Sequence, residues 1–293
     1  MADQAEHLRA LFHQHRISGA PRKRGLSRII VVASGKGGVG KSNIVVNLAI
    51  VFGQLGRKII ILDTDVGMAN VDVLLNLKPG YTLVDVIKGK KELSEVILRG
   101  PYNVEIVPGG SGFSEMVNLD NHQREQLISR LSYLEEKGDI LLIDCAAGLS
   151  RDILSFIAAA DELVVVTTPE PTALTDVYSI IKIVNNCGLK SRVNLVVNMA
   201  HGMKEAENVY GRLENVCRNY LDINLYFLGA IEYDLVVRKA VLDCSPYVLK
   251  YPNSRVSQCT RDIAQRLLAG GGGYSPAPKK EEGFLKRLIR MWR

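Results

Sequence analysis

Short apolar runs recur along the chain, and segments with apolar residues at helical spacing lie between them. The runs cover residues 29–33, 58–62, 140–143, 162–167, 193–197 and 225–230. The helical segments cover residues 43–55, 121–136, 150–160, 173–187 and 204–221. Continuous Val, Ile and Leu runs are typical of strands buried on both faces of a sheet. The pattern therefore predicts an α/β fold with a mostly parallel, twisted sheet flanked by helices on both faces.

Four of the predicted strands end in residues that can carry chemistry. A glycine-rich loop follows residue 33, and Asp63, Asp144 and Asn198 follow the second, third and fifth runs. In parallel α/β sheets the ligand binds outside the carboxyl ends of the strands. We therefore expect these four positions to line one site.

The loop after the first run has the pattern of a phosphate-binding P-loop, and it joins a predicted strand to a predicted helix as that motif requires. It reads Gly35, Lys36, Gly37, Gly38, Val39, Gly40, Lys41 and Ser42, followed by Asn43. The glycines at 37, 38 and 40 allow the backbone to turn its N–H groups and the helix N-terminus toward a β-phosphate. We expect Lys41 on the β- and γ-phosphate oxygens and the Ser42 hydroxyl on Mg²⁺. The loop predicts a P-loop NTPase that binds ATP or ADP with Mg²⁺.

Two carboxylates at strand ends are suited to support the same ion. Mg²⁺ prefers oxygen ligands and keeps most of its waters, which nearby aspartates can orient. A single Asp at a strand end is usually a turn or helix-cap residue, but Asp63 and Asp144 both end strands of a sheet that carries a P-loop. We therefore expect both carboxylates beside the Mg²⁺ site.

The second lysine of the loop, Lys36, narrows the pattern to a family. The loop, together with residues 63–72 and 144–148, resembles the deviant P-loop and the two switch segments of the MinD/ParA family. The resemblance implies a slow ATPase that forms a homodimer with ATP, in which Lys36 reaches the nucleotide of the partner subunit. It also implies that Asp65 positions the attacking water, so that Lys36, Lys41 and Asp65 form the catalytic set.

The same resemblance makes Asn198 the adenine contact, and a side-chain amide can both donate and accept hydrogen bonds as the adenine edge requires. Residues 231–238 match the region of the family that closes over the base. Asn43 is a departure, because the family commonly has a second hydroxyl residue at that position.

Composition limits the remaining classes of protein. The chain has 293 residues, of which 47% are hydrophobic, and this is enough for one large α/β core that we place at residues 26–268. No run approaches the ~18 apolar residues that a membrane span needs. The N-terminus has no signal-peptide character, so we expect a cytoplasmic protein. Five scattered cysteines without a C-x-x-C pair argue against a disulfide framework or a zinc site.

The net charge of +6 is concentrated in the two tails. Residues 1–28 carry six Lys or Arg against two acids, residues 279–293 do the same, and the body between them is left with a net charge of −2. Non-specific DNA binding relies on neutralising phosphates with basic side chains. The charge distribution therefore disfavours DNA as a partner and argues against a ParA-type DNA-partitioning ATPase.

The C-terminal tail has an amphipathic pattern. Residues 269–280 are a Gly and Pro linker, and residues 281–293 follow as a predicted helix. Its apolar face contains Phe284, Leu285, Leu288, Ile289 and Trp292, while its basic residues lie on the opposite side. This segregation is typical of a membrane-surface helix and resembles the MinD targeting sequence. We expect reversible binding to the anionic inner face of the cell membrane, with a helix that docks on its own domain as the alternative.

Residues 1–25 precede the domain as a predicted activator helix and basic linker. Asp3 is a suitable N-cap, with Glu6 three residues later. The extension resembles the activator motif of the FlhG (YlxH) branch of the family, the MinD-like regulators of flagellar placement and number. That resemblance implies stimulation of the FlhF-type GTPase and action on flagellar C-ring switch proteins. Gln4 and Arg9 are the candidate activating residues, because an amide can orient water and a guanidinium can stabilise charge. A MinD-type division-site positioning ATPase is the alternative.

Overall fold

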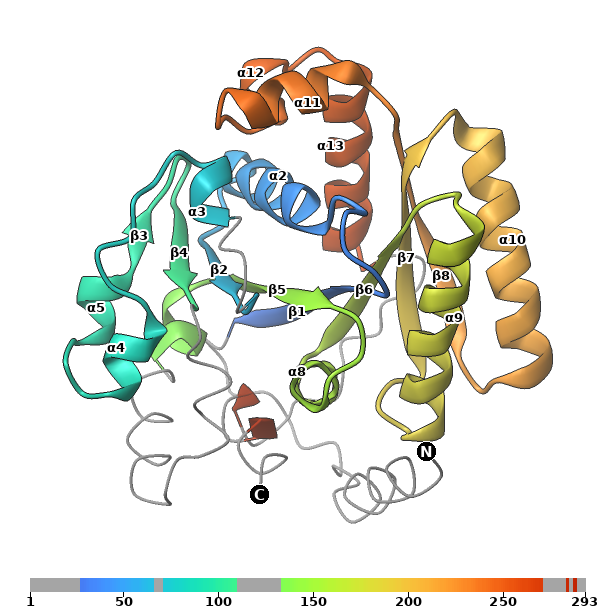
Figure 1. Cartoon of the computed structure of the whole chain (residues 1–293), viewed down its shortest axis with the longest axis horizontal. Coiled ribbons are helices and arrows are strands. Elements are labelled where there is room, and N and C mark those ends of the chain that lie inside the picture. Colours follow the sequence, from blue (N-terminus) through green and yellow to red (C-terminus); the bar gives the residue numbers. More distant parts are fainter. Residues whose placement is uncertain (1–26, 66–70, 110–132, 271–282, 285–286, 289–293) are drawn as a thin grey trace.

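A computed structural model describes residues 27–65, 71–109, 133–270, 283–284 and 287–288 (Figure 1). Among these residues, eight strands form one sheet in the order β3-β4-β2-β5-β1-β6-β7-β8. The strands are β1 (Arg28–Ser34), β2 (Ile59–Asp63), β3 (Leu98–Arg99), β4 (Val104–Pro108), β5 (Ile140–Ala147), β6 (Glu162–Thr167), β7 (Arg192–Ala200) and β8 (Asn224–Glu232). Every neighbouring pair is parallel except β3 and β4. The predicted α/β fold is confirmed.

Two strands at one edge of the sheet, β3 and β4, fall outside the apolar runs of the sequence. β3 has only two residues, and β4 includes the half-buried Glu105, whose carboxylate pairs with Lys137 at 2.7 Å. The turn between these strands contains two successive residues with positive φ, Tyr102 (53°) and Asn103 (59°). A short strand with a charged residue in its middle lacks the continuous apolar run that identifies the central strands.

The helices of the sequence pattern are present with small shifts at their ends. They are α2 (Lys41–Gln54), α8 (Arg151–Ala159), α9 (Pro171–Asn186) and α10 (Met203–Tyr220). Further helices are α3 (Val71–Leu74), α4 (Leu83–Ile87), α5 (Leu93–Val96), α11 (Leu235–Leu242), α12 (Tyr247–Lys250) and α13 (Arg255–Leu268). Most of the helix predicted at 121–136 lies outside the described residues, and residues 133–137 are helical.

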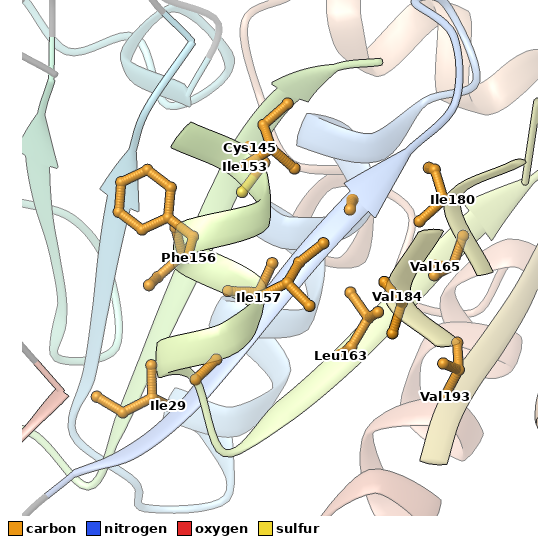
Figure 2. Close-up of a cluster of buried hydrophobic side chains, with 14 of the residues drawn as sticks. Ile29, Cys145, Ile153, Phe156, Ile157, Leu163, Val165, Ile180, Val184 and Val193 are labelled. Atoms are coloured by element: carbon orange, nitrogen blue, oxygen red, sulfur yellow. The ribbon is translucent and has the colours of Figure 1, made fainter. Parts of the chain in front are cut away.

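The sheet is buried on both faces, as its Val, Ile and Leu content requires. One apolar cluster packs α2, α12 and α13 on one face, and these helices lie above the sheet in Figure 1. The second cluster packs α8, α9 and α10 on the other face. Figure 2 shows part of this second cluster, where Phe156 and Ile157 of α8 pack over Ile29 of β1 and Leu163 of β6. The central strands β1 and β5 are thereby covered on both faces, and both lead directly into the candidate site.

Candidate functional site

The chemically active residues of four strands meet at one edge of the sheet. Asp63 and Asp144 are register partners on the adjacent parallel strands β2 and β5. β1 lies beside β5 and ends at Ser34, where the glycine-rich loop begins. Asn198 lies near the end of β7. A cavity of about 800 Å³ opens here and is lined by the loop, Asp65, Asn198 and residues of the 231–238 segment. The loop and Asn198 line this cavity directly, and Asp144 reaches its wall through Lys41, to which it is hydrogen-bonded.

The glycines of the loop differ in why the structure needs a glycine at each position. Gly38 and Gly40 adopt left-handed φ angles of 81° and 84°, which residues with a Cβ rarely adopt. A Cβ on Gly40 would lie 2.4 Å from Nδ2 of Asn198, and one on Gly35 would lie 2.3 Å from Cβ of Asp176. Nothing lies within 4 Å of a Cβ built on Gly37, so its local surroundings impose no such limit on size. The loop thus owes its shape to Gly38 and Gly40 and its close packing to Gly35 and Gly40.

Lys41 and Asp144 form a buried ion pair beneath the loop. The Lys41 ammonium donates to Oδ1 of Asp144, and the two side chains are 7% and 0% exposed. Lys41 is the first residue of α2, so its charge lies where the N–H groups at the start of the helix are also available to an anion. The arrangement presents a lysine and a helix N-terminus to the cavity, as binding of a phosphate chain requires.

Burial dominates the electrostatics of the two aspartates. Loss of solvation, together with the nearby charge of Asp144, raises the pKa of Asp63 to about 7. Burial also raises the pKa of Asp144, while the charge of Lys41 and hydrogen bonds from Lys41 and Ser42 act in the opposite direction. Two carboxylates this close are costly in a dry pocket unless a cation is near them. The site therefore favours an additional positive charge.

The same residues fit a magnesium ion that takes other ligands from phosphate and water. The second carboxylate oxygen of Asp144, Oδ2, is buried and has no hydrogen-bond partner among the described residues. Ser42 interacts with this carboxylate, so a hydroxyl and a free acceptor lie side by side. Within the described ranges no three His, Cys, Asp or Glu side chains gather closely enough to hold a metal by themselves. An ion that keeps its waters, as Mg²⁺ does, suits this arrangement.

Asp65 lies in the cavity wall, two residues after the end of β2. Its backbone N–H donates to Oδ1 of Asp63 at 3.0 Å, which fixes the start of the segment predicted as switch I. Residues 66–70 lie outside the described residues, and the chain resumes at α3. The structure therefore places Asp65 beside Asp63, and both its role in positioning water and the role of Asp63 and Asp144 beside Mg²⁺ stay predictions.

The region predicted to contact a base also lines the cavity. The Nδ2 of Asn198 donates to the carbonyl of Val39 at 2.8 Å, so its amide is tied to the P-loop. The next residue, Met199, has a left-handed φ of 56° and also lines the cavity. Tyr233, Asp234, Leu235 and Arg238 complete this wall. The adenine role of Asn198 stays a prediction, and its observed partner explains why the loop approaches β7 so closely.

Lys36 bonds within its own chain. Its ammonium donates to Oε2 of Glu170 and to Oγ1 of Thr172, the latter at 3.1 Å, at the beginning of α9. About a third of the Lys36 side chain is exposed, and Glu170 is mostly exposed. The lysine predicted to act across a dimer interface therefore lies at the surface, with a partner from its own subunit.

The described residues of the C-terminal tail pack against the ATPase domain. Phe284 and Leu288, predicted to face a membrane, are each 1% exposed and belong to the cluster under α8. Phe284 stacks on Phe156 with ring centroids 6.4 Å apart, and its N–H donates to Glu135 at 2.9 Å. Arg287 donates to the carbonyl of Ala159. In this structure the two apolar residues are docked on their own domain, which is the alternative that the amphipathic pattern left open.

Several predicted residues cannot be located. Leu285, Ile289 and Trp292 of the tail, and Gln4 and Arg9 of the activator helix, lie outside the described residues. In the part of the chain that is described, no helix is long and apolar enough to cross a bilayer.

Some residues of the site carry no sequence signal of their own. Glu170 and Thr172 reach Lys36 only because β6 pairs with β1 and brings the start of α9 beside the P-loop. Val73, Leu74, Val241 and Leu242 add an apolar wall to the cavity. The helical spacing of 235–242 is the one feature that could have indicated part of this wall.

Comparisons with known proteins agree with this geometry. Residues 25–268 match the ParA family model, described as NUBPL iron-transfer P-loop NTPase. The chain is 40% identical over 267 residues to the antiactivator FleN of Pseudomonas aeruginosa, covering 90% of this chain and 94% of FleN. It is 33% identical to the flagellum site-determining protein YlxH of Helicobacter pylori, covering 91% of each. The solved structure of the septum site-determining protein MinD of Pyrococcus horikoshii, in complex with Mg-ADP, matches with a TM-score of 0.67 and 29% identity, over 84% of this chain and 98% of that one.

Proposed function

The chain belongs to the ParA family of P-loop NTPases, and from that premise we propose that it is an ATP-dependent switch controlling the number and placement of flagella. Members of this family are ATPases that use ATP with Mg²⁺, and the P-loop, Lys41 and the two aspartates supply the corresponding groups here. The observation that carries the flagellar role is the 40% identity to FleN, which spans nearly the full length of both chains.

The Lys41 and Asp144 ion pair suggests how the site receives its nucleotide. Phosphate oxygens compete with Asp144 for the Lys41 ammonium, because both are anions within reach of the same donor. With Lys41 on the phosphates, the carboxylate of Asp144 would be released and, together with Ser42 and Asp63, would hold Mg²⁺ through its waters. Asp65, fixed through Asp63, then holds the water that attacks the γ-phosphate. Bound Mg²⁺ supplies the positive charge that screens the phosphate oxygens.

ATP joins two copies of the chain in this proposal, with Lys36 acting across the interface. The P-loop and Lys41 hold phosphate within one subunit, which leaves Lys36 available for a second task. Its position at the surface, about one third exposed, supports contact with a partner subunit. Hydrolysis removes the γ-phosphate and ends the attraction between the subunits.

The C-terminal tail then links the nucleotide state to the membrane. Phe284 and Leu288 cannot enter a lipid surface while they are buried against α8. α8 begins three residues after Gly148, the end of the segment predicted as switch II. Movement of that segment on ATP binding can therefore reach Phe156, the residue on which Phe284 stacks. We infer that the dimer releases its tails and presents two of them to an anionic surface.

The partners of this switch follow from the family branch. Residues 1–25 are proposed to stimulate an FlhF-type GTPase through Gln4 and Arg9, and flagellar C-ring switch proteins are proposed as the structure on which the protein acts. The relationship to FleN and YlxH supports a flagellar setting for these partners. A division-site role is the second candidate, because the fold also matches MinD.

Flagellar counts and cell division in the native host distinguish the two roles. The Lys41→Ala variant, expressed in place of the wild type, should abolish ATP hydrolysis by the purified protein and change the number or position of flagella. The exposed Lys182→Ala change on α9 is the matched control. Minicells or misplaced septa with normal flagella would favour the division-site role and refute the flagellar one.

A further inference from the structure

The contact between Lys36 and the beginning of α9 is the observation from which we start. Lys36 lies on the loop after β1, and Glu170 lies on the connection after β6. The two strands are parallel neighbours, so their following segments emerge side by side at the same edge of the sheet. The Lys36 ammonium has two hydrogen-bond partners in the described part of the chain, Glu170 and Thr172.

Backbone packing holds the two segments together independently of this ion pair. Gly35 lies so close to α9 that a Cβ on it would come within 2.3 Å of Cβ and 2.7 Å of the carbonyl carbon of Asp176. The hydroxyl of Ser34 donates to the carbonyl of Lys36 at 3.1 Å, and this fixes the backbone from which the side chain projects. Backbone packing therefore places the Lys36 side chain at the start of α9. The charges at that position then determine whether the ammonium remains bound there.

A lysine is unfavourable at this place unless a carboxylate neutralises it. The N-terminus of a helix carries a partial positive charge, which repels an ammonium group. Glu170 is the N-cap residue of α9, with Pro171 following as the first helical residue. Its carboxylate makes no capping hydrogen bond, but its negative charge suits the helix end and pairs with Lys36. Without that charge, Lys36 would face only the Thr172 hydroxyl and the helix dipole.

We propose that Glu170 is a positioning residue that holds Lys36 within its own subunit and thereby sets the threshold for ATP-dependent dimerisation. This rests on the proposed role of Lys36 across the interface, because the same ammonium cannot bind Glu170 and the partner's nucleotide together. Both side chains are partly exposed, Lys36 at 34% and Glu170 at 61%. An ion pair this exposed is weak, so it biases the equilibrium without blocking it.

The ion pair between Lys36 and Glu170 should weaken dimerisation by a modest factor. An exposed ion pair shifts an equilibrium by about two- to fivefold. Both subunits must release Lys36, so the effect on the dimer dissociation constant is the square, about 4- to 25-fold. Increasing salt weakens the pair by screening. As salt increases, the dimer dissociation constant of the wild type should therefore approach that of a variant that lacks the carboxylate.

The test compares Glu170→Gln with the wild type by sedimentation equilibrium in the presence of a non-hydrolysable ATP analogue. The variant should dimerise about 4- to 25-fold more tightly in low salt, about 0.05 M, and the difference should narrow at about 0.5 M. Thr172→Val should lower the dimer dissociation constant by a smaller factor, because it removes only the hydroxyl that accepts from Lys36. Glu207→Gln, an exposed charge removal on α10, is the matched control and should behave as the wild type.

The Lys36→Ala background separates the possible outcomes. The gain from Glu170→Gln should vanish in the double variant Lys36→Ala/Glu170→Gln, because no lysine remains to be released. Weaker dimerisation of Glu170→Gln would overturn the proposal and make Glu170 an attractive partner in the dimer. An unchanged constant, with Lys36→Ala defective, would overturn it too while leaving the role of Lys36 intact. Normal dimerisation of Lys36→Ala alone would instead refute the role of Lys36 itself.

Discussion

Asp63 and Asp144 stand opposite one another as register partners on neighbouring parallel strands, and both are buried. The ammonium of Lys41 bonds to Asp144 and supplies positive charge to the pair. Burial and the neighbouring carboxylate therefore leave Asp63 with a pKa raised to about 7. The geometry suits a site that gains a divalent cation together with its nucleotide.

The first prediction concerns stability without nucleotide or Mg²⁺. The pKa of Asp63 is raised on folding from 3.8 to about 7, so unfolding releases a proton between these values. Stability should then fall as pH increases from about 4 to about 7 and level off above. Asp63→Asn removes this penalty and should stabilise the protein at pH 8 by roughly 2 to 4 kcal/mol, with little effect near pH 4.

Urea unfolding at both pH values measures this change in the free energy of unfolding. Asp222→Asn, an exposed change, is the control, and equal pH dependence of Asp63→Asn and wild type would contradict the raised pKa.

The second prediction is that Lys36→Ala keeps ADP binding but loses ATP-dependent dimerisation. The backbone loop and Lys41 hold phosphate within one subunit, whereas Lys36 is proposed to reach the partner. Gel filtration with a non-hydrolysable ATP analogue, and titration with a fluorescent ADP, check the two halves. Lys182→Ala should dimerise normally. A Lys36→Ala protein that dimerises like the wild type would remove the role across the interface.

The third prediction is that Asp65→Ala traps the ATP-bound dimer. Loss of the carboxylate that orients the attacking water should slow hydrolysis by about 10²-fold or more, while the contacts that bind nucleotide remain. Phosphate release and sizing of the same sample decide the matter, with Asp222→Ala as the control. Unchanged turnover would refute the assignment, and loss of the dimer would move Asp65 from catalysis to assembly.

The fourth prediction separates the docked tail from the membrane-bound tail. Phe284→Glu should lose binding to anionic liposomes in both nucleotide states, because it removes the apolar face of the helix. Glu135→Ala leaves the apolar face of the tail intact but removes the carboxylate that accepts the N–H of Phe284, and it should increase liposome binding with ADP. Wild type should bind more with ATP than with ADP, since two linked tails raise avidity by about 10²- to 10⁴-fold.

Liposome sedimentation measures all three proteins, and Tyr220→Glu on the exposed end of α10 is the control. Binding by the wild type that is equal in ATP and ADP would show that the tail is not switched by nucleotide. Unchanged binding of Glu135→Ala would show that docking does not limit access to the membrane.

The fifth prediction is that a synthetic peptide of residues 1–25 stimulates an FlhF-type GTPase by itself. The motif lies outside the ATPase domain, so the domain should not be needed. Peptides with Gln4→Ala or Arg9→Ala should lose the effect, and a peptide with His13→Ala is the control. Stimulation by the full chain but not by the peptide would assign the activity to the folded domain.

The sequence by itself determined those features of the protein whose signals lie in neighbouring residues of the chain. Continuous apolar runs identified the central strands, because a strand covered on both faces buries every side chain and therefore consists of apolar residues. The P-loop was evident because its glycines, lysine and serine are neighbours in the chain. The shared edge for Asp63, Asp144 and Asn198 followed from the geometry of parallel strands, without any contact being known.

Tertiary structure decided what depends on partners distant in the sequence. Glu170 meets Lys36 across 134 positions of the chain, through the pairing of β1 with β6, and no local pattern marks it. The amphipathic tail shows the limit most clearly, because an apolar helix face is equally suited to a lipid surface and to a groove on the protein. Only the surface formed by Phe156, Glu135 and the end of α8 decides that Phe284 and Leu288 are buried here, since that surface exists only once the chain has folded.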